Sequence, residues 1–248
     1  MITIIPVEGI GVITKGMDFP GQIWSAAGKD GKGLLDGDVL VVSSKAVSKW
    51  EGNVRNAADI KVSPQAAELS GILGKTAAYC QVVLDETVKT VRLVRGLMIS
   101  RNKQGFVLAN AGVDASNTQK EGDLIPLPAD SDASARRIRD DVRLRHGIGI
   151  AVIVSDTFGR TWRKGQTDMA VGVAGIAPLL DYSGRLDSRG RKMKTTCIAV
   201  ADELAGAANL AAEKTAMIPA VIIRGYGYQR KESSIGEVLM EEERDLFQ

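Results

Sequence analysis

Ile148-Gly-Ile-Ala-Val-Ile-Val154 is the apolar run around which the fold is expected to form, and Ser155-Asp-Thr157 follows it directly. Its length and branched side chains predict a buried strand, and the polar triplet predicts the end of that strand. A second run of the same kind, Val39-Leu-Val-Val42, leads into Ser43-Ser-Lys45. A polar group just past a strand stands on a rigid scaffold and still reaches a cleft, so both strand ends are candidate functional positions.

Helices and further strands extend outward from these two runs. Ser63 and Pro64 are typical of a helix N-cap and first helical position, and Gly74 is typical of a helix end. The other expected strands are Ile2–Val7, Val88–Arg95, Met98–Ser100, Phe106–Ala109 and Ala220–Arg224, and the expected helices are Ile23–Ala27, Pro64–Leu73, Ala135–His146, Val200–Lys214 and Ser233–Phe247. This order predicts an α+β fold with mixed and antiparallel sheets and flanking helices. We expect a single domain over residues 1–248, with the polar connector 126–134 as the best candidate for an internal boundary.

The composition excludes several classes of function. Of the 248 residues, 44% are hydrophobic and 25% are charged, which is ordinary for a globular protein. The net charge of +2 and the aromatic content of 4% argue against a nucleic-acid partner, which favours a basic field and exposed rings. No apolar stretch is long enough for a bilayer and no secretory signal is evident, so we expect no membrane partner and a cytoplasmic location.

The cysteine and histidine content also limits the chemistry. Cys80 and Cys197 fit no metal-ligand spacing, and two buried free thiols are consistent with a reducing cytoplasm. The single histidine, His146, lies at an expected helix end, where a charge interaction with that end is the favoured interpretation. One histidine argues against a histidine-based triad or a zinc site.

Two acidic segments follow expected strands and are candidates for a metal site. One is Asn110-Ala-Gly-Val-Asp114-Ala-Ser-Asn117, and the other contains Asp156 and Thr157. Two converging carboxylates would bind Mg²⁺ or Mn²⁺, because hard cations prefer oxygen ligands, and Thr157 would add another oxygen. Each aspartate could equally cap a turn, so the pattern alone leaves both interpretations open.

A phosphate site is predicted on the segment from Ser43 to Lys49. Hydroxyls and backbone N–H groups at a strand end can point at phosphate oxygens, and two lysines supply charge. Two other glycine-containing segments do not qualify. Residues 71–76 lack the P-loop spacing and the helix after the lysine. Residues 9–14 lack the third glycine of a dinucleotide fingerprint.

Basic residues cluster in three places. The run 136–145 is expected to be solvated surface. The segment 159–168 places Arg160, Trp162, Arg163 and Lys164 between glycines, which favours a loop that binds substrate or phosphate. The segment 181–191 is a weaker candidate of the same kind, with solvated surface as the alternative.

Several of these segments occur together in one known family. The most specific is Ser155-Asp-Thr-Phe-Gly-Arg-Thr-Trp-Arg163, and the others are Val42–Lys49, Ala109–Asn117, Ala170–Ile176, Asp181–Arg185 and Ala220–Gly225. On these segments the chain resembles the coenzyme F420-0:L-glutamate ligases, or F420 γ-glutamyl ligases, over nearly its full length. The resemblance implies a homodimer with the family's own uncommon α+β fold. It also implies GTP and a divalent ion, Mg²⁺ or Mn²⁺, with K⁺ as a further ion in some members.

The resemblance also implies roles for individual residues. The metal ligands are expected to be Asp114, Asp156 and Thr157. The nucleotide contacts are expected to be Ser44, Lys45, Lys49 and Asn117, together with the N-terminal turn Ile10, Gly11, Val12 and Ile13. The residues expected to take part in catalysis are Asp156, Arg160 and Arg163. Many members carry a Met-Gly pair where this chain has Ala212-Glu213, which leaves the selectivity for the base open and makes Glu213 a further candidate ligand.

The implied reaction is the GTP-dependent ligation of L-glutamate to F420-0. GTP would phosphorylate the terminal carboxylate of F420-0, and the α-amino group of glutamate would attack the acyl phosphate, with further γ-glutamyl additions possible in the same way. Two alternatives belong to other classes: a metal-dependent phosphohydrolase or kinase acting on a phosphorylated small molecule, and a non-catalytic nucleotide-binding module.

Overall fold

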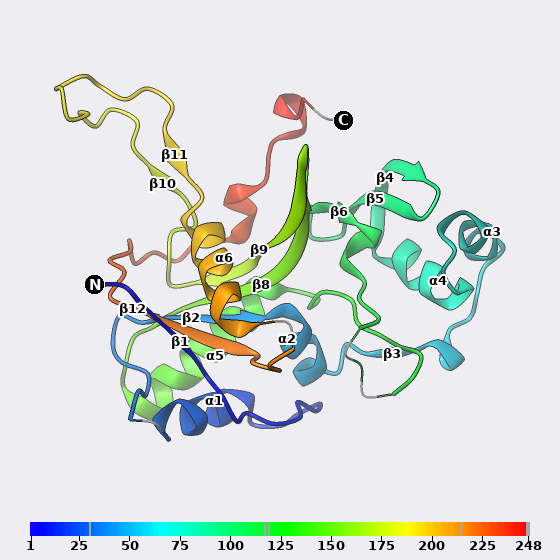
Figure 1. The fold of residues 1–248 in the computed structure, drawn as a ribbon, viewed down its shortest axis with the longest axis horizontal. Coiled ribbons are helices and arrows are strands. Elements are labelled where there is room, and N and C mark those ends of the chain that lie inside the picture. The colour runs from blue at the N-terminus through cyan, green and yellow to red at the C-terminus, as the bar shows by residue number, and fades with distance from the viewer. Residues whose placement is uncertain (30, 117, 119, 214, 247–248) are drawn as a thin grey trace.

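The computed structural model describes residues 1–29, 31–116, 118, 120–213 and 215–246. Its centre is a five-stranded sheet in the order β1-β12-β2-β8-β9 (Figure 1). These strands are β1 Thr3–Pro6, β2 Val39–Ser43, β8 Ala151–Arg160, β9 Arg163–Ala174 and β12 Ala220–Arg224. β2 and β8 run parallel, and the other neighbouring pairs are antiparallel. The mixed sheet is confirmed, and the two apolar runs that predicted it lie side by side at its centre.

Helices cover both faces of this sheet. α6 (Val200–Ala212) lies in front of the sheet in Figure 1, and α5 (Ser131–His146) packs behind β8 and β9, with α1 (Phe19–Gly28) against it. Gly172 of β9 allows α5 to approach closely, because a Cβ atom there would lie 2.4 Å from the carbonyl carbon of Ser131. α2 (Ser44–Glu51) begins directly after β2.

A second, smaller unit is inserted between α2 and α5. Its elements are β3 Arg55–Asn56, η1 Ala57–Asp59, α3 Pro64–Leu73, α4 Ala77–Glu86, β4 Thr87–Val94, β5 Leu97–Asn102, β6 Val107–Ala109, η2 Asn110–Gly112 and β7 Asp123–Leu124. It has an apolar cluster of its own, with Leu69, Val83 and Met98 among its buried members. The predicted cap of α3 is confirmed, because the Ser63 hydroxyl accepts a hydrogen bond from the Ala66 N–H.

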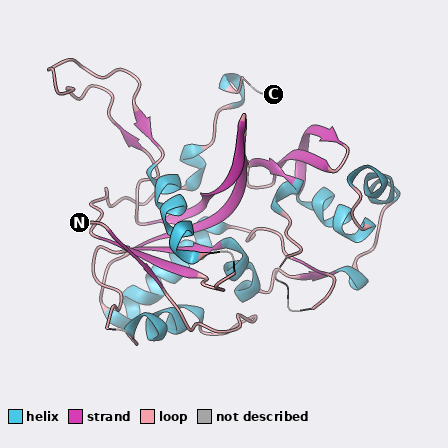
Figure 2. Ribbon diagram, viewed as in Figure 1, coloured by secondary structure: helices cyan, strands magenta, loops and turns pink. Residues whose placement is uncertain are grey.

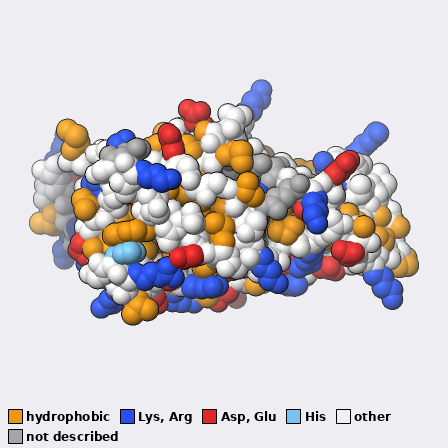
Figure 3. All heavy atoms as spheres, turned by 90° about the horizontal axis from the view of Figure 1, so that it is seen from below, with side chains coloured by type: hydrophobic (Ala, Val, Ile, Leu, Met, Phe, Trp, Pro, Cys, Tyr) orange, Lys and Arg blue, Asp and Glu red, His pale blue; other side chains and the backbone are white. Residues whose placement is uncertain are grey.

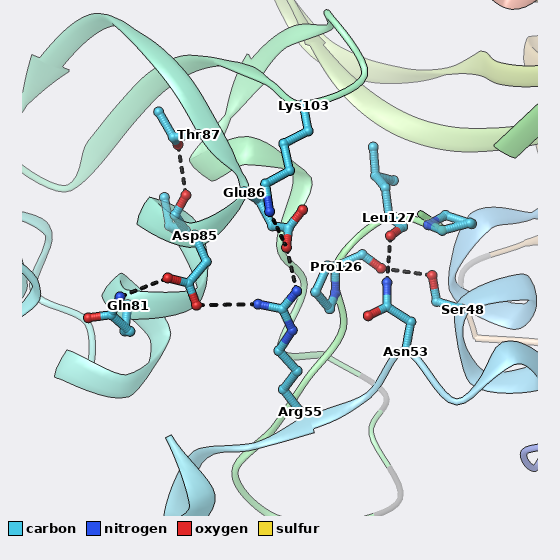
Figure 4. A network of polar contacts seen from close by, with 12 residues as sticks. Ser48, Asn53, Arg55, Gln81, Asp85, Glu86, Thr87, Lys103, Pro126 and Leu127 are labelled. Atoms are coloured by element: carbon cyan, nitrogen blue, oxygen red, sulfur yellow. Dashed lines mark hydrogen bonds and ion pairs between the residues drawn. The ribbon is translucent and has the colours of Figure 1, made fainter. Parts of the chain in front are cut away.

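Polar contacts secure the smaller unit and the connector that leads back from it (Figure 4). Arg55 of β3 forms ion pairs with Asp85 and Glu86 of α4. Asn53 lies just after α2, and its side chain donates a hydrogen bond of 2.7 Å to the Leu127 carbonyl. The start of the connector is therefore held against the larger unit. The division of the chain near residues 126–134 stays a prediction.

Four local expectations differ from the structure. α5 begins at Ser131, four residues before the expected Ala135, because the Asp130 carboxylate accepts from the Ala133 N–H and caps it. β8 does not end at Ser155-Asp156-Thr157 but continues to Arg160, because β9 pairs with it throughout. The prediction of two buried thiols is wrong for Cys197, which is exposed, and right for Cys80.

The fourth difference is the C-terminal segment, where a helix over Ser233–Phe247 is wrong. Among the described residues up to 246 it contains only two short 3₁₀ turns, η3 (Ile235–Val238) and η4 (Glu242–Arg244). Its polar groups find partners elsewhere on the protein. The Ile235 N–H donates to Asp132, and Glu242 pairs with Lys89 at 2.7 Å. These contacts tie the segment to α5 and to β4 in place of a helix of its own.

Most of the basic run on α5 is surface, as expected, but the Arg139 side chain is only 15% exposed and pairs with Asp140 and Glu232. Arg145 pairs with Asp18 at 2.6 Å, and Arg137 lies over the ring of Trp50. His146 stacks on Trp24 with ring centroids 3.5 Å apart, so a ring contact accompanies its position at the end of α5. Figure 3 shows basic, acidic and apolar side chains mixed on the underside, with the histidine beside apolar groups. None of the helices in the described part of the chain is both long and apolar enough to cross a membrane.

Candidate functional site

A cavity of about 930 Å³ lies where the two units meet. It receives side chains from α2, from the segment after η2, from β8 and β9, and from the segment after α6. The charged residues in its wall are Lys45, Lys49, Lys75, Asp114, Asp156, Asp168 and Glu213. Its volume falls in the range of sites that enclose a ligand of nucleotide size.

The central sheet creates this cavity by ending unevenly. The ladder between β2 and β8 stops at the pair Ser43–Ser155. Beyond that pair, β2 turns into α2 while β8 continues with β9. Asp156 and Thr157 therefore lie on a strand whose edge faces the cavity, which corrects the expectation of a loop. The pairing with β9 gives these side chains a more rigid support than a loop would.

Asp156 lies deep in the cavity wall. Its carboxylate accepts a 2.6 Å hydrogen bond from the hydroxyl of the buried Ser44 at the start of α2. Burial raises the pKa of Asp156 to about 6, the Ser44 hydrogen bond opposes that shift, and repulsion from Asp168 and Asp114 adds to it. Three carboxylates thus act on one another electrostatically at this wall, and a cation would relieve the repulsion.

Asp114 enters the cavity from the smaller unit, on the segment that follows η2. The Lys45 ammonium lies 2.6 Å from its carboxylate, and the Ser116 N–H donates to the same group. Burial disfavours ionisation of Asp114, but the hydrogen bonds from Lys45 and Ser116 outweigh it, so its pKa is lowered. Asp114 and Asp156 therefore face one shared cavity, as the metal-site hypothesis requires.

The two lysines of α2 provide positive charge in the same wall. Lys45 and Lys49 are one turn apart on the helix, so their side chains lie on one face. Burial lowers the pKa of Lys49, and repulsion from Lys45 lowers it further, while Asp114 partly offsets both. An anionic group such as a phosphate would remove this repulsion between the lysines.

Asp168 is a site residue that the sequence analysis did not single out. It lies on β9 directly opposite Thr157 of β8, and the Thr157 hydroxyl donates to its carboxylate at 2.6 Å. The expectation for segment 159–168 was a loop, whereas most of it forms paired strand on either side of a tight turn. The pairing of Asp168 with Thr157 depends on the irregular register of this hairpin, which the sequence does not display.

The other predicted site residues are placed as follows. Gly11, Val12 and Ile13 line the cavity, whereas Ile10 is buried in the apolar core. Asn117 lies outside the described residues. Arg160 and Arg163 flank the tip of the β8–β9 hairpin and do not line the cavity. At that tip, the Arg160 side chain donates hydrogen bonds to the carbonyls of Lys164 and Gly165. Their part in catalysis stays a prediction.

The second basic loop is likewise remote from the cavity wall. Residues 181–191 belong to an arm that projects from the large unit, with the short strands β10 (Leu180–Asp181) and β11 (Cys197–Ile198) at its base (Figure 2). The segment after α6 does reach the cavity. Glu213 and Met217 line it with φ of 47° and 54°, backbone angles that cost energy for residues with side chains.

The oxygen groups in the wall fit a hard cation. Carboxylates from Asp114 and Asp156, with the hydroxyl of Thr157 beside them, are the donor types that Mg²⁺ and Mn²⁺ take. Ser44, a predicted nucleotide contact, is buried; its hydroxyl donates to Asp156, and it does not line the cavity. Among the described residues, no three Asp, Glu, His or Cys side chains come close enough to form a complete metal-binding group. A metal here would therefore complete its shell with water or substrate phosphates, as Mg²⁺ commonly does.

Comparisons with known proteins agree with the resemblance found in the sequence. A family model described as F420-0:Gamma-glutamyl ligase matches residues 9–225. The chain is 41% identical over 249 residues to the Coenzyme F420:L-glutamate ligase of Methanothermobacter thermautotrophicus, covering 99% of this chain and 98% of that protein. A Methanococcus maripaludis protein of the same name is 41% identical over 86% of each chain. One from Archaeoglobus fulgidus is 38% identical over 99% of this chain and 96% of its own length.

Proposed function

The chain belongs to the F420-0:gamma-glutamyl ligase family, and on that premise we propose that it joins L-glutamate to coenzyme F420-0 at the expense of GTP. The observation that carries the proposal is that Asp114 and Asp156, on two different units, share one cavity with Lys45 and Lys49. Carboxylates suited to a hard cation beside ammonium groups suited to phosphate are the combination that a nucleoside triphosphate and its metal need.

The proposed reaction has two displacements. A terminal carboxylate oxygen of F420-0 attacks the γ-phosphorus of GTP, so that an acyl phosphate forms and GDP leaves. The α-amino nitrogen of glutamate then attacks the acyl carbon, an amide forms, phosphate leaves and the amine loses a proton. Activation by phosphate is needed because a carboxylate does not form an amide in water unaided.

The residues of the cavity have distinct parts in this proposal. Lys45 and Lys49 orient the phosphates and stabilise charge on the transferred group. A divalent cation, Mg²⁺ or Mn²⁺, held by Asp114, Asp156 and Thr157, would neutralise the charge that develops during phosphoryl transfer. The homodimer, the K⁺ ion and the roles of Arg160 and Arg163 belong to the proposal through the family resemblance.

Mass spectrometry provides the test. F420-0 is incubated with the protein, GTP, Mg²⁺ and L-glutamate, with Asp156→Asn as the inactive control. We expect a product heavier by whole glutamyl units and GDP release that requires both acceptor and glutamate. GDP release that is independent of glutamate would favour a phosphohydrolase or kinase. Nucleotide binding with no turnover would favour a non-catalytic module.

A further inference from the structure

Asp168 accepts hydrogen bonds from hydroxyl groups on β8, the strand that also carries Asp156. The Thr157 hydroxyl donates to one of its carboxylate oxygens at 2.6 Å, and the Ser155 hydroxyl lies 3.4 Å from the other. Asp168 and Thr157 both line the cavity. Neither the composition of segment 159–168 nor its cluster of cations pointed to this contact.

A β-bulge places Asp168 in this position. Val154 pairs with Gly172 and Ser155 pairs with Ala170, so β9 has one extra residue, Val171, at this point. Without the extra residue the register would place Met169 opposite Thr157, and an apolar side chain would take the place of the carboxylate. Bulges commonly re-aim a side chain beside a functional site.

The bulge is held in place from α6. The Asp202 carboxylate accepts a 2.9 Å hydrogen bond from the Ala170 N–H, at the bulge itself. Gly206, one turn further along α6, brings the helix close to β9: a Cβ atom there would lie 3.4 Å from the Thr167 hydroxyl and 3.8 Å from the Asp168 carbonyl. The register that presents Asp168 is therefore fixed by a packed helix.

We propose that Asp168 is a positioning residue that orients the Thr157 hydroxyl toward the cation of the proposed reaction. A hydroxyl has one proton and two acceptor lone pairs. With its proton directed to Asp168, the Thr157 hydroxyl can meet a cation as an acceptor, and the negative partner makes its oxygen a better ligand. This inference rests on the metal site of the proposed function.

The test measures metal affinity in the absence of nucleotide and substrates, through the electron paramagnetic resonance signal of free Mn²⁺. Asp168→Ala should weaken Mn²⁺ binding by about 10- to 100-fold, the usual effect of losing a partner that orients a ligand. Asp168→Asn keeps an acceptor oxygen for Thr157 and should recover most of that affinity. Asp59→Asn, an exposed carboxylate elsewhere, should bind Mn²⁺ like the wild type.

A double-mutant cycle separates positioning from a general charge effect. If Asp168 acts through Thr157, then Thr157→Val should weaken Mn²⁺ binding about as much as Asp168→Ala does. Adding Asp168→Ala to the Thr157→Val variant should then lower the Mn²⁺ affinity only a little further. Additive losses, or an Asp168→Asn variant as weak as Asp168→Ala, would overturn the positioning role while leaving the metal site intact. Wild-type protein that binds no Mn²⁺ would overturn the metal site and this inference with it. If circular dichroism shows Asp168→Ala to be unfolded, Asp168→Leu replaces it, since leucine fills the space without an acceptor.

Discussion

Replacing Asp156 by asparagine should stabilise the metal-free protein while abolishing its activity. Asparagine has nearly the same shape and can still accept the hydrogen bond from Ser44, but it carries no charge. The change therefore removes the cost of holding Asp156 ionised, which comes first from its burial and then from repulsion by Asp168 and Asp114. It also removes a proposed metal ligand. Stability and activity should consequently move in opposite directions.

The size of the stability change follows from the pKa of Asp156. That pKa rises from the ordinary 3.8 to about 6, chiefly through burial. A shift of one pKa unit corresponds to about 1.4 kcal/mol, so ionised Asp156 costs up to about 3 kcal/mol. Because the folded state holds this proton more tightly than the unfolded chain, the stability of the wild type declines as pH rises from about 4 to about 6. Above that window the full cost is present, and below it the cost vanishes.

Urea unfolding at pH 8 and at pH 4.5, with chelator present, provides the assay. The variant should exceed the wild type by about 1–3 kcal/mol at pH 8 and by much less at pH 4.5. Asp36→Asn is the matched control, for which the stability change should have the opposite sign. Hydrogen bonds from Arg230 and Gly149 lower the pKa of Asp36, so loss of this carboxylate should destabilise the protein at pH 8. A variant no more stable than the wild type at pH 8, or a difference independent of pH, would refute the reasoning.

Two further predictions address the nucleotide and the packing of the sheet. Lys49→Met should weaken GTP binding by about tenfold or more in calorimetry, since a hydrogen bond to a charged group contributes about 1.5–3 kcal/mol. As the control, Lys61→Met on the exposed surface should leave GTP binding unchanged. Gly172→Ala should destabilise the fold by about 1–3 kcal/mol in urea, because the new methyl group meets the Ser131 backbone at 2.4 Å. Gly71→Ala, inside α3 with open space at its Cβ, should instead stabilise by about 0.5–1 kcal/mol, and equal effects at both glycines would contradict the packing argument.

The central sheet could be predicted from the sequence because burial on both faces leaves a continuous apolar run. Val39–Val42 and Ile148–Val154 are such runs, and the structure pairs their strands β2 and β8 in parallel. The continuation of β8 past Ser155 could not be predicted in this way. Its residues are polar because they line a cavity, and their strand conformation comes from pairing with β9 rather than from burial.

The site residues could be predicted from the sequence only in part, for a related reason. Asp114 and Asp156 each follow an apolar strand segment, which the sequence displays, and both line the cavity. Asp168 depends on a one-residue bulge, and no local pattern reveals which side of a hairpin carries an extra residue. The prediction of a C-terminal helix was wrong because Ile235 and Glu242 bind partners that are far away in sequence, and the spacing of apolar residues gives no information about such contacts.

In the proposed reaction the smaller unit would take a direct part, because it carries Asp114. Asn110 and Ala111 have φ of 48° and 53°, and this tight turn aims the following segment at the cavity. The Tyr79 hydroxyl of α4 donates to the Val113 carbonyl at 3.0 Å and fixes that aim from within the smaller unit. Asp156, by contrast, belongs to the central sheet. The separation of the two carboxylates is therefore set by how the units pack, and contacts such as that of Asn53 with Leu127 restrain it. A change that loosens this junction should lower metal affinity even though it touches no ligand.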